Sequence, residues 1–232
     1  MEQLFNFSVI TDNFTYFMIG RFPHGPLGGV GLTLYLAVVS CILSFFGGMI
    51  LGLLSISRFP LVRYPALAFI NLVRGMPLLM VIFWMYFLMP ALFGKIAENN
   101  TVIMALTLFT SAYMSRIVVA GIEGIPKGQT EAAISTGLKS WQVMLYIVLP
   151  QGLRNMIPSF VNQFVSLIKD TSLAFIVGVS ELTHVATQIN NRTMAFPTEI
   201  FIFIAIIYFI LCYAFTSLSR WLEQRLSWNK AI

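Results

Sequence analysis

The stretch GVGLTLYLAVVSCILSFFGGMILGLLSI occupies residues 29–56 and contains no lysine, arginine, aspartate or glutamate. The interval without these residues extends beyond it on both sides, from Arg21 to Arg58. A helix needs about 20 mostly apolar residues to cross the hydrocarbon core of a bilayer. The sequence therefore predicts a membrane-spanning helix over this stretch.

The composition of the whole chain indicates the same class of protein. Of 232 residues, 58% are hydrophobic and 10% are charged, whereas about 25% are charged in an average soluble domain. So few charges cannot solvate so much apolar surface, which excludes a soluble domain, a disordered chain and a disulfide scaffold. The net charge of +5 fits basic residues retained in cytoplasmic loops, and without a basic run it does not indicate nucleic-acid binding.

The cysteine and histidine residues are too far apart in the sequence to suggest a metal site or a catalytic site. Cys41 and Cys212 both lie in apolar stretches, where a free cysteine behaves as a small hydrophobic residue. His24 and His184 are far apart, and no CxxC pair occurs. The sequence therefore predicts no metal site, no cofactor and no catalytic residue.

Five apolar segments are long enough to cross the membrane. We expect an all-α integral membrane protein in which residues 29–222 form the membrane domain, with a cytoplasmic tail at 223–232. Residues 1–28 are expected to be an extracytoplasmic or interfacial lead-in, and the absence of early basic residues argues against a cleaved signal peptide. The predicted spans are about 29–56, 65–92, 101–122, 156–179 and 200–219.

The charges between the spans predict the orientation. With the N-terminus outside, eight basic residues fall inside and three outside, as the positive-inside rule requires. The C-terminus and the long loop 126–154 then face the cytoplasm. The inside residues are Arg58, Arg63, Lys127, Lys139, Arg154, Arg220, Arg225 and Lys230, and the outside residues are Arg21, Lys95 and Arg192.

The loop 126–154 is too polar to cross the membrane, yet its pattern predicts two helices. Pro126 suits a first helical turn, and Gly137 suits a helix end in the left-handed conformation. Ser140 is expected to cap the second helix and Pro150 to end it. The apolar face of this second helix is expected to contain Trp141, Met144, Leu145 and Val148. These residues alone leave two alternatives open, a docking element for a partner protein and an interfacial helix pair that only covers the bundle.

Glu131-Ala132-Ala133, three further residues, Gly137 and the ending Leu149-Pro150 resemble the "EAA loop" of membrane subunits of bacterial ABC importers. From about residue 31 to residue 226 the chain resembles the polar amino-acid permeases of the histidine, glutamine and glutamate type. Further motifs that carry the resemblance are Gly-Leu-Thr-Leu at 31–34, Arg-Gly-Met-Pro-Leu-Leu at 74–79, Ile-Pro-Lys-Gly-Gln at 125–129, Leu-Pro-Gln at 149–151, Lys-Asp-Thr-Ser-Leu at 169–173 and Gly-Val-Ser-Glu-Leu-Thr at 178–183.

This resemblance implies a fold and a set of partners. The fold is that of a type I ABC importer permease, with five transmembrane helices and a cytoplasmic coupling helix. The expected partners are two ATP-binding subunits, a second copy or a similar permease subunit, a periplasmic or lipid-anchored amino-acid-binding protein, and membrane lipid. Glu131, Ala132, Ala133 and Gly137 would dock on the ATPase and transmit its closure. The sequence has no G-x-x-x-x-G-K-[ST] loop, so ATP hydrolysis is expected on a partner.

Ionisable residues inside the predicted spans are the candidates for a substrate path, because each costs on the order of 2.5–3.5 kcal/mol on insertion scales. Arg74, Lys169, Asp170 and Thr171 match positions of the family. Structural pairing is the alternative role, notably with Asp170 as a counter-ion. Arg116 departs from the family, because many relatives have Ala-Tyr-x-x-Glu-x-x-Arg in the third span. Here Arg116 replaces the glutamate, so an acid–base pair becomes a lone cation.

A lone cation in a span needs an anion, either a substrate carboxylate or a carboxylate of a partner subunit. The sequence thus favours an ABC permease of the bacterial inner membrane that carries glutamate or aspartate. Glutamine, or a broader range of polar amino acids, is the alternative. An autonomous channel or secondary carrier is a more distant one, and no residue cluster supports an enzyme.

Overall fold

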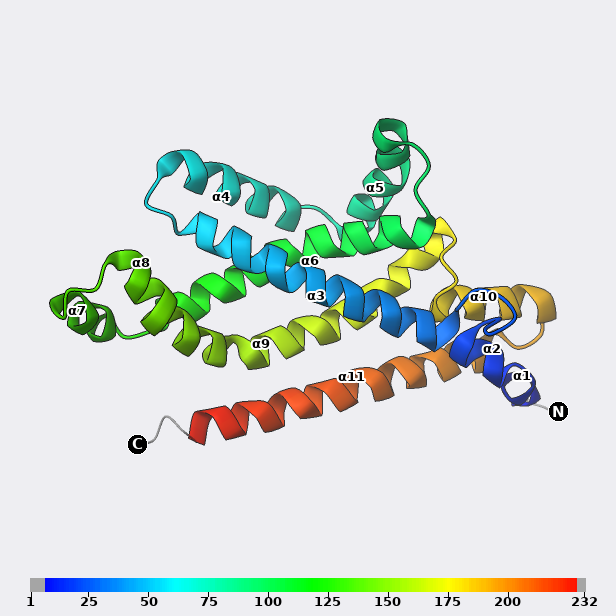
Figure 1. The fold of residues 1–232 in the computed structure, drawn as a ribbon. Coiled ribbons are helices and arrows are strands. Elements are labelled where there is room, and N and C mark those ends of the chain that lie inside the picture. The colour runs from blue at the N-terminus through cyan, green and yellow to red at the C-terminus, as the bar shows by residue number, and fades with distance from the viewer. Residues whose placement is uncertain (1–6, 229–232) are drawn as a thin grey trace. The chain divides into compact units, whose positions relative to one another are not determined.

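The computed structural model describes residues 7–228, which are folded almost entirely into helices (Figure 1). The all-α prediction is confirmed. In order, the helices are α1 Ser8–Asp12, α2 Phe14–Ile19, α3 Gly29–Ser55, α4 Pro60–Arg74, α5 Leu78–Phe93, α6 Glu98–Glu123, α7 Lys127–Ser135, α8 Ser140–Val143, a π-helical turn Met144–Val148, α9 Leu149–Asp170, a 3₁₀ segment Thr171–Val177, α10 Leu182–Thr193 and α11 Pro197–Trp228.

Four helical stretches of the described chain are long and apolar enough to cross a membrane: Gly29–Ser55, Glu98–Glu123, Ser140–Val177 and Pro197–Arg225. The predicted second span, 65–92, is not one helix. It is broken between α4 and α5, so a fifth span exists only if the two helices are counted together. Pro77 explains the break, because proline disfavours helical backbone at the residue before it and cannot donate a helical hydrogen bond.

The chain forms two compact units, and α3, α6, α9 and α11 each contribute to both. Unit 1 comprises the described residues up to Ile42, Pro77–Thr107 and Phe164–Ala214. Unit 2 comprises Leu43–Met76, Leu108–Gln163 and the described residues from Phe215 onward.

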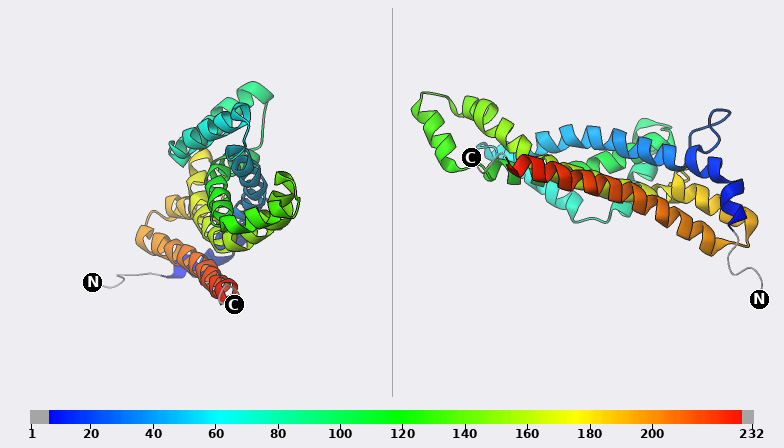
Figure 2. Two further views of the ribbon diagram at one scale, coloured as in Figure 1. Left: turned by 90° about the vertical axis from the view of Figure 1, so that its left-hand side faces the viewer. Right: turned by 90° about the horizontal axis from the view of Figure 1, so that it is seen from below.

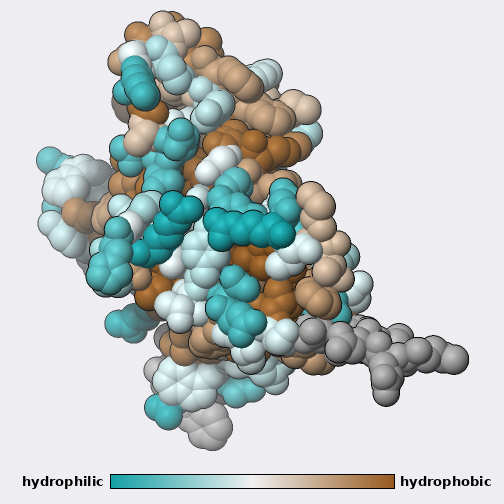
Figure 3. Space-filling view, turned by 90° about the vertical axis from the view of Figure 1, so that its right-hand side faces the viewer, coloured by the Kyte–Doolittle hydropathy of each residue, from teal (hydrophilic) through white to brown (hydrophobic). Residues whose placement is uncertain are grey.

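The core of unit 1 joins the N-terminal helices to α10 and α11. Phe17 of α2 is fully buried, and its ring meets that of Phe203 edge to face at 5.0 Å. Val185 and Ile189 of α10 and Ile200 of α11 belong to the same cluster. The helices α1 and α2 of the expected N-terminal lead-in, residues 1–28, are thus packed into unit 1. Hydrophilic side chains gather over the middle of the face that carries α2 and α10 (Figure 3).

Unit 2 places α7 and α8 together at one end, as the views in Figure 2 show. Beneath them lies an apolar cluster built by the end of α6, by α7 and by the start of α9. Val118 and Ile122 of α6 and Ala133 of α7 belong to this cluster, together with Val143 and Val148. The cluster fixes the short helices to the long ones, so the predicted coupling loop is anchored by burial.

Close packing of α3 on α6 is the second feature of unit 2. A Cβ atom at Gly48 would lie 2.5 Å from Cβ of Met114, and one at Gly52 would lie 2.8 Å from Cβ of Val118. Gly47, Gly48 and Gly52 therefore let the two backbones approach more closely than any larger residue would allow. Small residues at helix interfaces are the usual means of association inside a membrane.

Candidate functional site: coupling loop and arginine groove

Helix α7 is the exposed part of the predicted coupling loop. Pro126 precedes its first residue, and Glu131 and Ala132 face solvent. Ala133 is 8% exposed and packs into the apolar cluster of unit 2. One side of the helix is thus anchored, and the other presents Glu131 for contact.

Gly137 ends α7 in the way the sequence predicts. Its φ is +88°, a left-handed value that glycine adopts without strain. Its N–H donates to the carbonyl of Ile134 at 2.9 Å, and the N–H of Leu138 donates to the carbonyl of Ala133 at 3.4 Å. This hydrogen-bond pair is the Schellman arrangement.

The second predicted helix differs from the expectation at both ends. Ser140 is the first helical residue and not the cap; the side-chain oxygen of Gln142 accepts from the backbone N–H of Lys139 at 2.8 Å. Pro150 does not end the helix. The helical backbone continues through a π-helical turn into α9, so Pro150 directly follows a segment in which the regular i→i−4 hydrogen bonding is already interrupted.

The π-helical turn also changes the apolar face. Val143 and Val148, five residues apart, are both buried. Trp141 and Leu145 of the predicted face are 58% and 48% exposed, and the Trp141 ring lies 6.3 Å from that of Tyr146. A wider turn shifts the register of the helix, which a regular 3.6-residue period could not predict.

Arg116 lines a groove of about 480 Å³ between α6 and α9 in unit 2. Ala120, Gly121 and Gly124, which have a small side chain or none, line the groove on the α6 side. Asn155 and Ser159 supply polar groups from α9, and none of the described residues that line the groove is acidic. Arg116 is exposed to this groove, so the lone cation expected from the sequence is accessible in the single chain and not enclosed.

The polar face of α9 continues beyond the groove. Asn155, Ser159, Asn162 and Ser166 follow one another at intervals of four, three and four residues, which places them on one side of a helix. Ser159 and Asn162 are exposed. Exposed polar groups within a membrane span face water or another protein surface in preference to lipid. The groove and this face therefore mark the polar side of the helix.

The other predicted path residues do not line the groove. The guanidinium of Arg74 lies over the Tyr113 ring, with Cζ 5.2 Å from its centre. Lys169, Asp170 and Thr171 belong to unit 1, at the junction of α9 and the 3₁₀ segment. Thr171 is buried and donates to the carbonyl of Ile168 at 2.7 Å.

Sequence reasoning missed the role of Glu181 in unit 1. This buried carboxylate precedes α10 and accepts hydrogen bonds from the backbone N–H groups of Thr183 at 2.9 Å and His184 at 2.8 Å. The Tyr208 hydroxyl of α11 donates to it at 2.9 Å. Burial raises the pKa of Glu181 to about 7, although these donors oppose the shift. The signals in the sequence were an acidic residue directly before a polar helix and its place in the Gly-Val-Ser-Glu-Leu-Thr motif at 178–183.

The N-terminus of α3 joins the same network. The Leu182 N–H donates to Thr33 Oγ1 at 3.1 Å, and the Gly29 N–H donates to the carbonyl of Ser180 at 3.0 Å. Helices α3, α10 and α11 are therefore fixed to one another in unit 1 by buried polar groups.

Helices long and apolar enough to cross a membrane, one of them with an exposed polar face, agree with the class of membrane transport subunits. Comparison with known families is consistent with this class. Residues 44–228 match the family described as "Binding-protein-dependent transport system inner membrane component". The chain belongs to this family, and it is an inner-membrane permease of the amino-acid ABC importer type, in which a partner ATPase hydrolyses ATP.

Individual relatives are described as permeases for different amino acids. The chain is 41% identical over 199 residues to the probable glutamine ABC transporter permease GlnP of Bacillus subtilis, covering 85% of this chain and 91% of the relative. It is 31% identical to the glutamate/aspartate import permease GltK of Escherichia coli O6:H1, covering 86% and 92%. A crystal structure of an amino acid ABC transporter with histidines matches with a TM-score of 0.77 and 30% identity, covering 83% of this chain and 90% of that one.

Proposed function

We propose that this permease carries an acidic amino acid, glutamate or aspartate, into the bacterial cell. The observation that carries the proposal is Arg116, an accessible guanidinium in a groove that is lined by no acidic residue within the described part of the chain. A guanidinium binds a carboxylate through two parallel hydrogen bonds, and Asn155 and Ser159 could hold the remaining polar groups. Glutamine is the second candidate, because the B. subtilis relative is described as a probable glutamine permease.

The test replaces Arg116 and compares two amino acids. Arg116→Gln is expected to lower glutamate uptake about tenfold, the cost of one charge-assisted hydrogen bond, and to lower glutamine uptake less. Arg116→Lys keeps the charge but lacks the planar guanidinium, so its glutamate uptake should lie between that of wild type and that of Arg116→Gln. Uptake is measured in reconstituted complexes with a binding protein that accepts both amino acids, so that delivery is constant.

Arg220→Gln is the matched control, because Arg220 is an exposed arginine of unit 2 that does not line the groove. If Arg116→Gln lowers both fluxes equally, or neither, Arg116 is structural and the acidic substrate assignment fails.

Coupling to ATP hydrolysis is proposed to pass through α7. We infer that Glu131, Ala132, Ala133 and Gly137 dock on the ATP-binding subunit. The exposed Glu131 and the anchored Ala133 support this, since a force on one side of α7 would reach α6 through the other. The working complex would contain two ATP-binding subunits, a second permease subunit and an amino-acid-binding protein.

This arrangement requires α7 on the cytoplasmic side, with the N-terminus outside. A reporter that is active only in the cytoplasm should therefore work when fused after Ile232 and fail when inserted near Asn99. The eight-to-three distribution of basic residues is the reason, although Lys230 lies outside the described residues. Activity at Asn99 with none at Ile232 would reverse the topology and remove the coupling proposal.

A further inference from the structure

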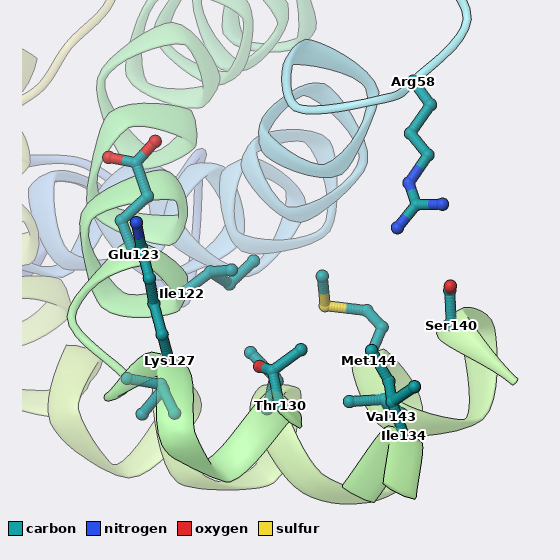
Figure 4. A pocket seen from close by; sticks show the side chains of 11 residues that line it. Arg58, Ile122, Glu123, Lys127, Thr130, Ile134, Ser140, Val143 and Met144 are labelled. Atoms are coloured by element: carbon teal, nitrogen blue, oxygen red, sulfur yellow. The ribbon is translucent and has the colours of Figure 1, made fainter. Parts of the chain in front are cut away.

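The groove at Arg116 and the half-open cavity beside α7 are both accounted for by the functions proposed above. Lys127 and Ile134 line that cavity (Figure 4) and lie four and three residues from Glu131, next to the proposed docking surface. Unit 1 contains a further group that neither function uses, the buried carboxyl group of Glu181.

Glu181 is held at the junction of α3, α10 and α11 by neutral hydrogen-bond donors. The residue is 0% exposed. Its Oε1 accepts the backbone N–H of His184, and its Oε2 accepts the backbone N–H of Thr183 and the hydroxyl of Tyr208. Within the described part of the chain, no cationic side chain bonds to this carboxylate. The charged form of Glu181 is therefore buried without a counter-ion.

Two opposing effects set the proton affinity of this carboxyl group. Burial disfavours its charged form, whereas the three hydrogen-bond donors favour that form. Burial is the larger effect, and it raises the pKa of Glu181 to about 7. The neutral and the charged forms are therefore both populated near neutral pH.

The hydroxyl groups beside Glu181 can satisfy both of these forms. The Tyr208 hydroxyl lies 2.9 Å from Glu181 Oε2 and 3.1 Å from Thr183 Oγ1, and either hydroxyl of the second pair can be the donor. When Glu181 is charged, Tyr208 donates to it and Thr183 donates to Tyr208. When Glu181 is neutral, it donates to Tyr208, and Tyr208 donates to Thr183. Rotation of two hydroxyl groups thus accommodates the proton without moving a helix.

The other titratable side chains of the surrounding helices have partners of their own. On α10, Nδ1 of His184 lies 3.3 Å from a backbone carbonyl oxygen of the 3₁₀ segment. On α2, the Tyr16 hydroxyl donates to Gln188, and the Arg192 guanidinium lies over the Tyr16 ring, with Cζ 5.6 Å from its centre. Helix α3 contributes an uncharged threonine hydroxyl to the junction. None of these contacts supplies a charge that balances Glu181.

We propose that Glu181 is a proton-binding site that holds α3, α10 and α11 together in acid and loosens their junction in alkaline solution. The neutral carboxyl group stays buried with its hydrogen bonds satisfied, whereas the charged group gains free energy by reaching water. A shift of Glu181 would displace Tyr208 of α11, and also Leu182, whose N–H donates to Thr33 of α3. Glu181 lies between two stretches that can cross the membrane, and in the proposed orientation this connection faces outward. External pH would therefore set the state of the site.

The experiment compares the melting temperatures of the purified protein and of Glu181→Gln, a mimic of the neutral form, in one detergent. A glutamate in an unfolded chain has a pKa of about 4.3, and the pKa in the folded chain is about 7. Proton binding therefore stabilises the folded chain fully below the lower value, and this stabilisation is lost as the pH rises through the higher value. The melting temperature of Glu181→Gln minus that of wild type should thus grow by about 5 °C from pH 5 to pH 8.

Two matched variants test whether this change belongs to Glu181. Glu98→Gln removes an exposed carboxylate of the same unit, so its difference from wild type should not change with pH. His184→Gln removes the neighbouring imidazole and should leave the pH dependence in place. If the difference between Glu181→Gln and wild type is constant over this range, or if His184→Gln abolishes the pH dependence, the proposal is wrong.

Infrared spectroscopy tests the site even if Glu181→Gln does not fold. The carbonyl stretch of a neutral carboxyl group is lost on ionisation, so the wild-type signal should fall between pH 5 and pH 8. Tyr208→Phe removes a donor that favours the charged form, so the midpoint of this fall should move to higher pH. A wild-type signal that does not change, or a midpoint that is the same in Tyr208→Phe, overturns the proposal. The result does not depend on the cargo or on Arg116.

Discussion

Replacing Gly48 by valine is expected to remove most of the folded protein from the membrane. A Cβ atom there would lie 2.5 Å from Cβ of Met114 and 3.1 Å from the backbone of Met114 and Ser115. Backbone atoms of α6 cannot move aside as a flexible side chain can, so α3 and α6 must separate. Overpacking of this kind costs about 3 kcal/mol. For a chain of this length that corresponds to a fall in melting temperature of about 10 °C.

Thermal unfolding of the purified protein in detergent, together with its abundance in the membrane, checks this expectation. Gly48→Ala should already destabilise measurably, because even one methyl group meets Met114. Leu43→Val is the control on the same helix, since Leu43 is 46% exposed. If Gly48→Val melts within about 2 °C of wild type, equivalent to less than 1 kcal/mol, the close approach of α3 and α6 is incorrect.

Gly137→Val should have the opposite pattern, with normal insertion and almost no transport. Apart from its two chain neighbours, no described residue has a heavy atom within 4 Å of a Cβ built at Gly137, so the added side chain has open space. The difficulty is the backbone, because a left-handed conformation costs about 1–2 kcal/mol for a residue with a side chain, and valine is among the least tolerant. The turn that ends α7 should therefore rearrange and displace the proposed docking surface.

Uptake and stimulated ATP hydrolysis are expected to fall more than tenfold in Gly137→Val, since about 1.4 kcal/mol corresponds to a factor of ten. Gly137→Asn should retain much more activity, because asparagine tolerates the left-handed region. Gly128→Val on α7 also has open space around it and does not have a positive φ, so it controls for added bulk. Glu131→Lys should impair coupling by reversing the exposed charge. Near-normal uptake by both Gly137→Val and Glu131→Lys would contradict the coupling role.

The sequence was sufficient for features that depend on composition and on single special residues. Charge-free apolar stretches predicted α3 and α11, and an apolar stretch with Arg116 as its one charged residue predicted α6, because crossing a bilayer requires both length and apolarity. Gly137 was identified as a helix end because few residues other than glycine adopt a positive φ easily. The resemblance to ABC importer permeases led to the family that the comparisons establish.

Features that depend on neighbouring elements could not be predicted. The π-helical turn at Met144–Val148 changes which residues of the loop are buried, and no local sequence pattern predicted this turn. The sequence identified Arg116 as a lone cation in the third span, but it could not predict that Arg116 would be exposed to a groove lined by small residues such as Ala120 and Gly121. Glu181 accepts a hydrogen bond from Tyr208 of another helix, and the adjacent Leu182 N–H donates to Thr33, which lies 149 residues earlier in the sequence.

The buried network around Glu181 has a consequence for biosynthesis. Thr33 near the start of the chain bonds to Leu182, 149 residues later, and Tyr16 bonds to Gln188, 172 residues later. The ribosome synthesises the N-terminal helices first. Thr33 and Tyr16 therefore lack Leu182 and Gln188 as hydrogen-bond partners during most of translation. Only after α10 and the part of α11 with Tyr208 have emerged can unit 1 close. A prematurely terminated chain would insert its first helices with open polar positions, a defect that quality-control proteases could recognise before the subunit assembles.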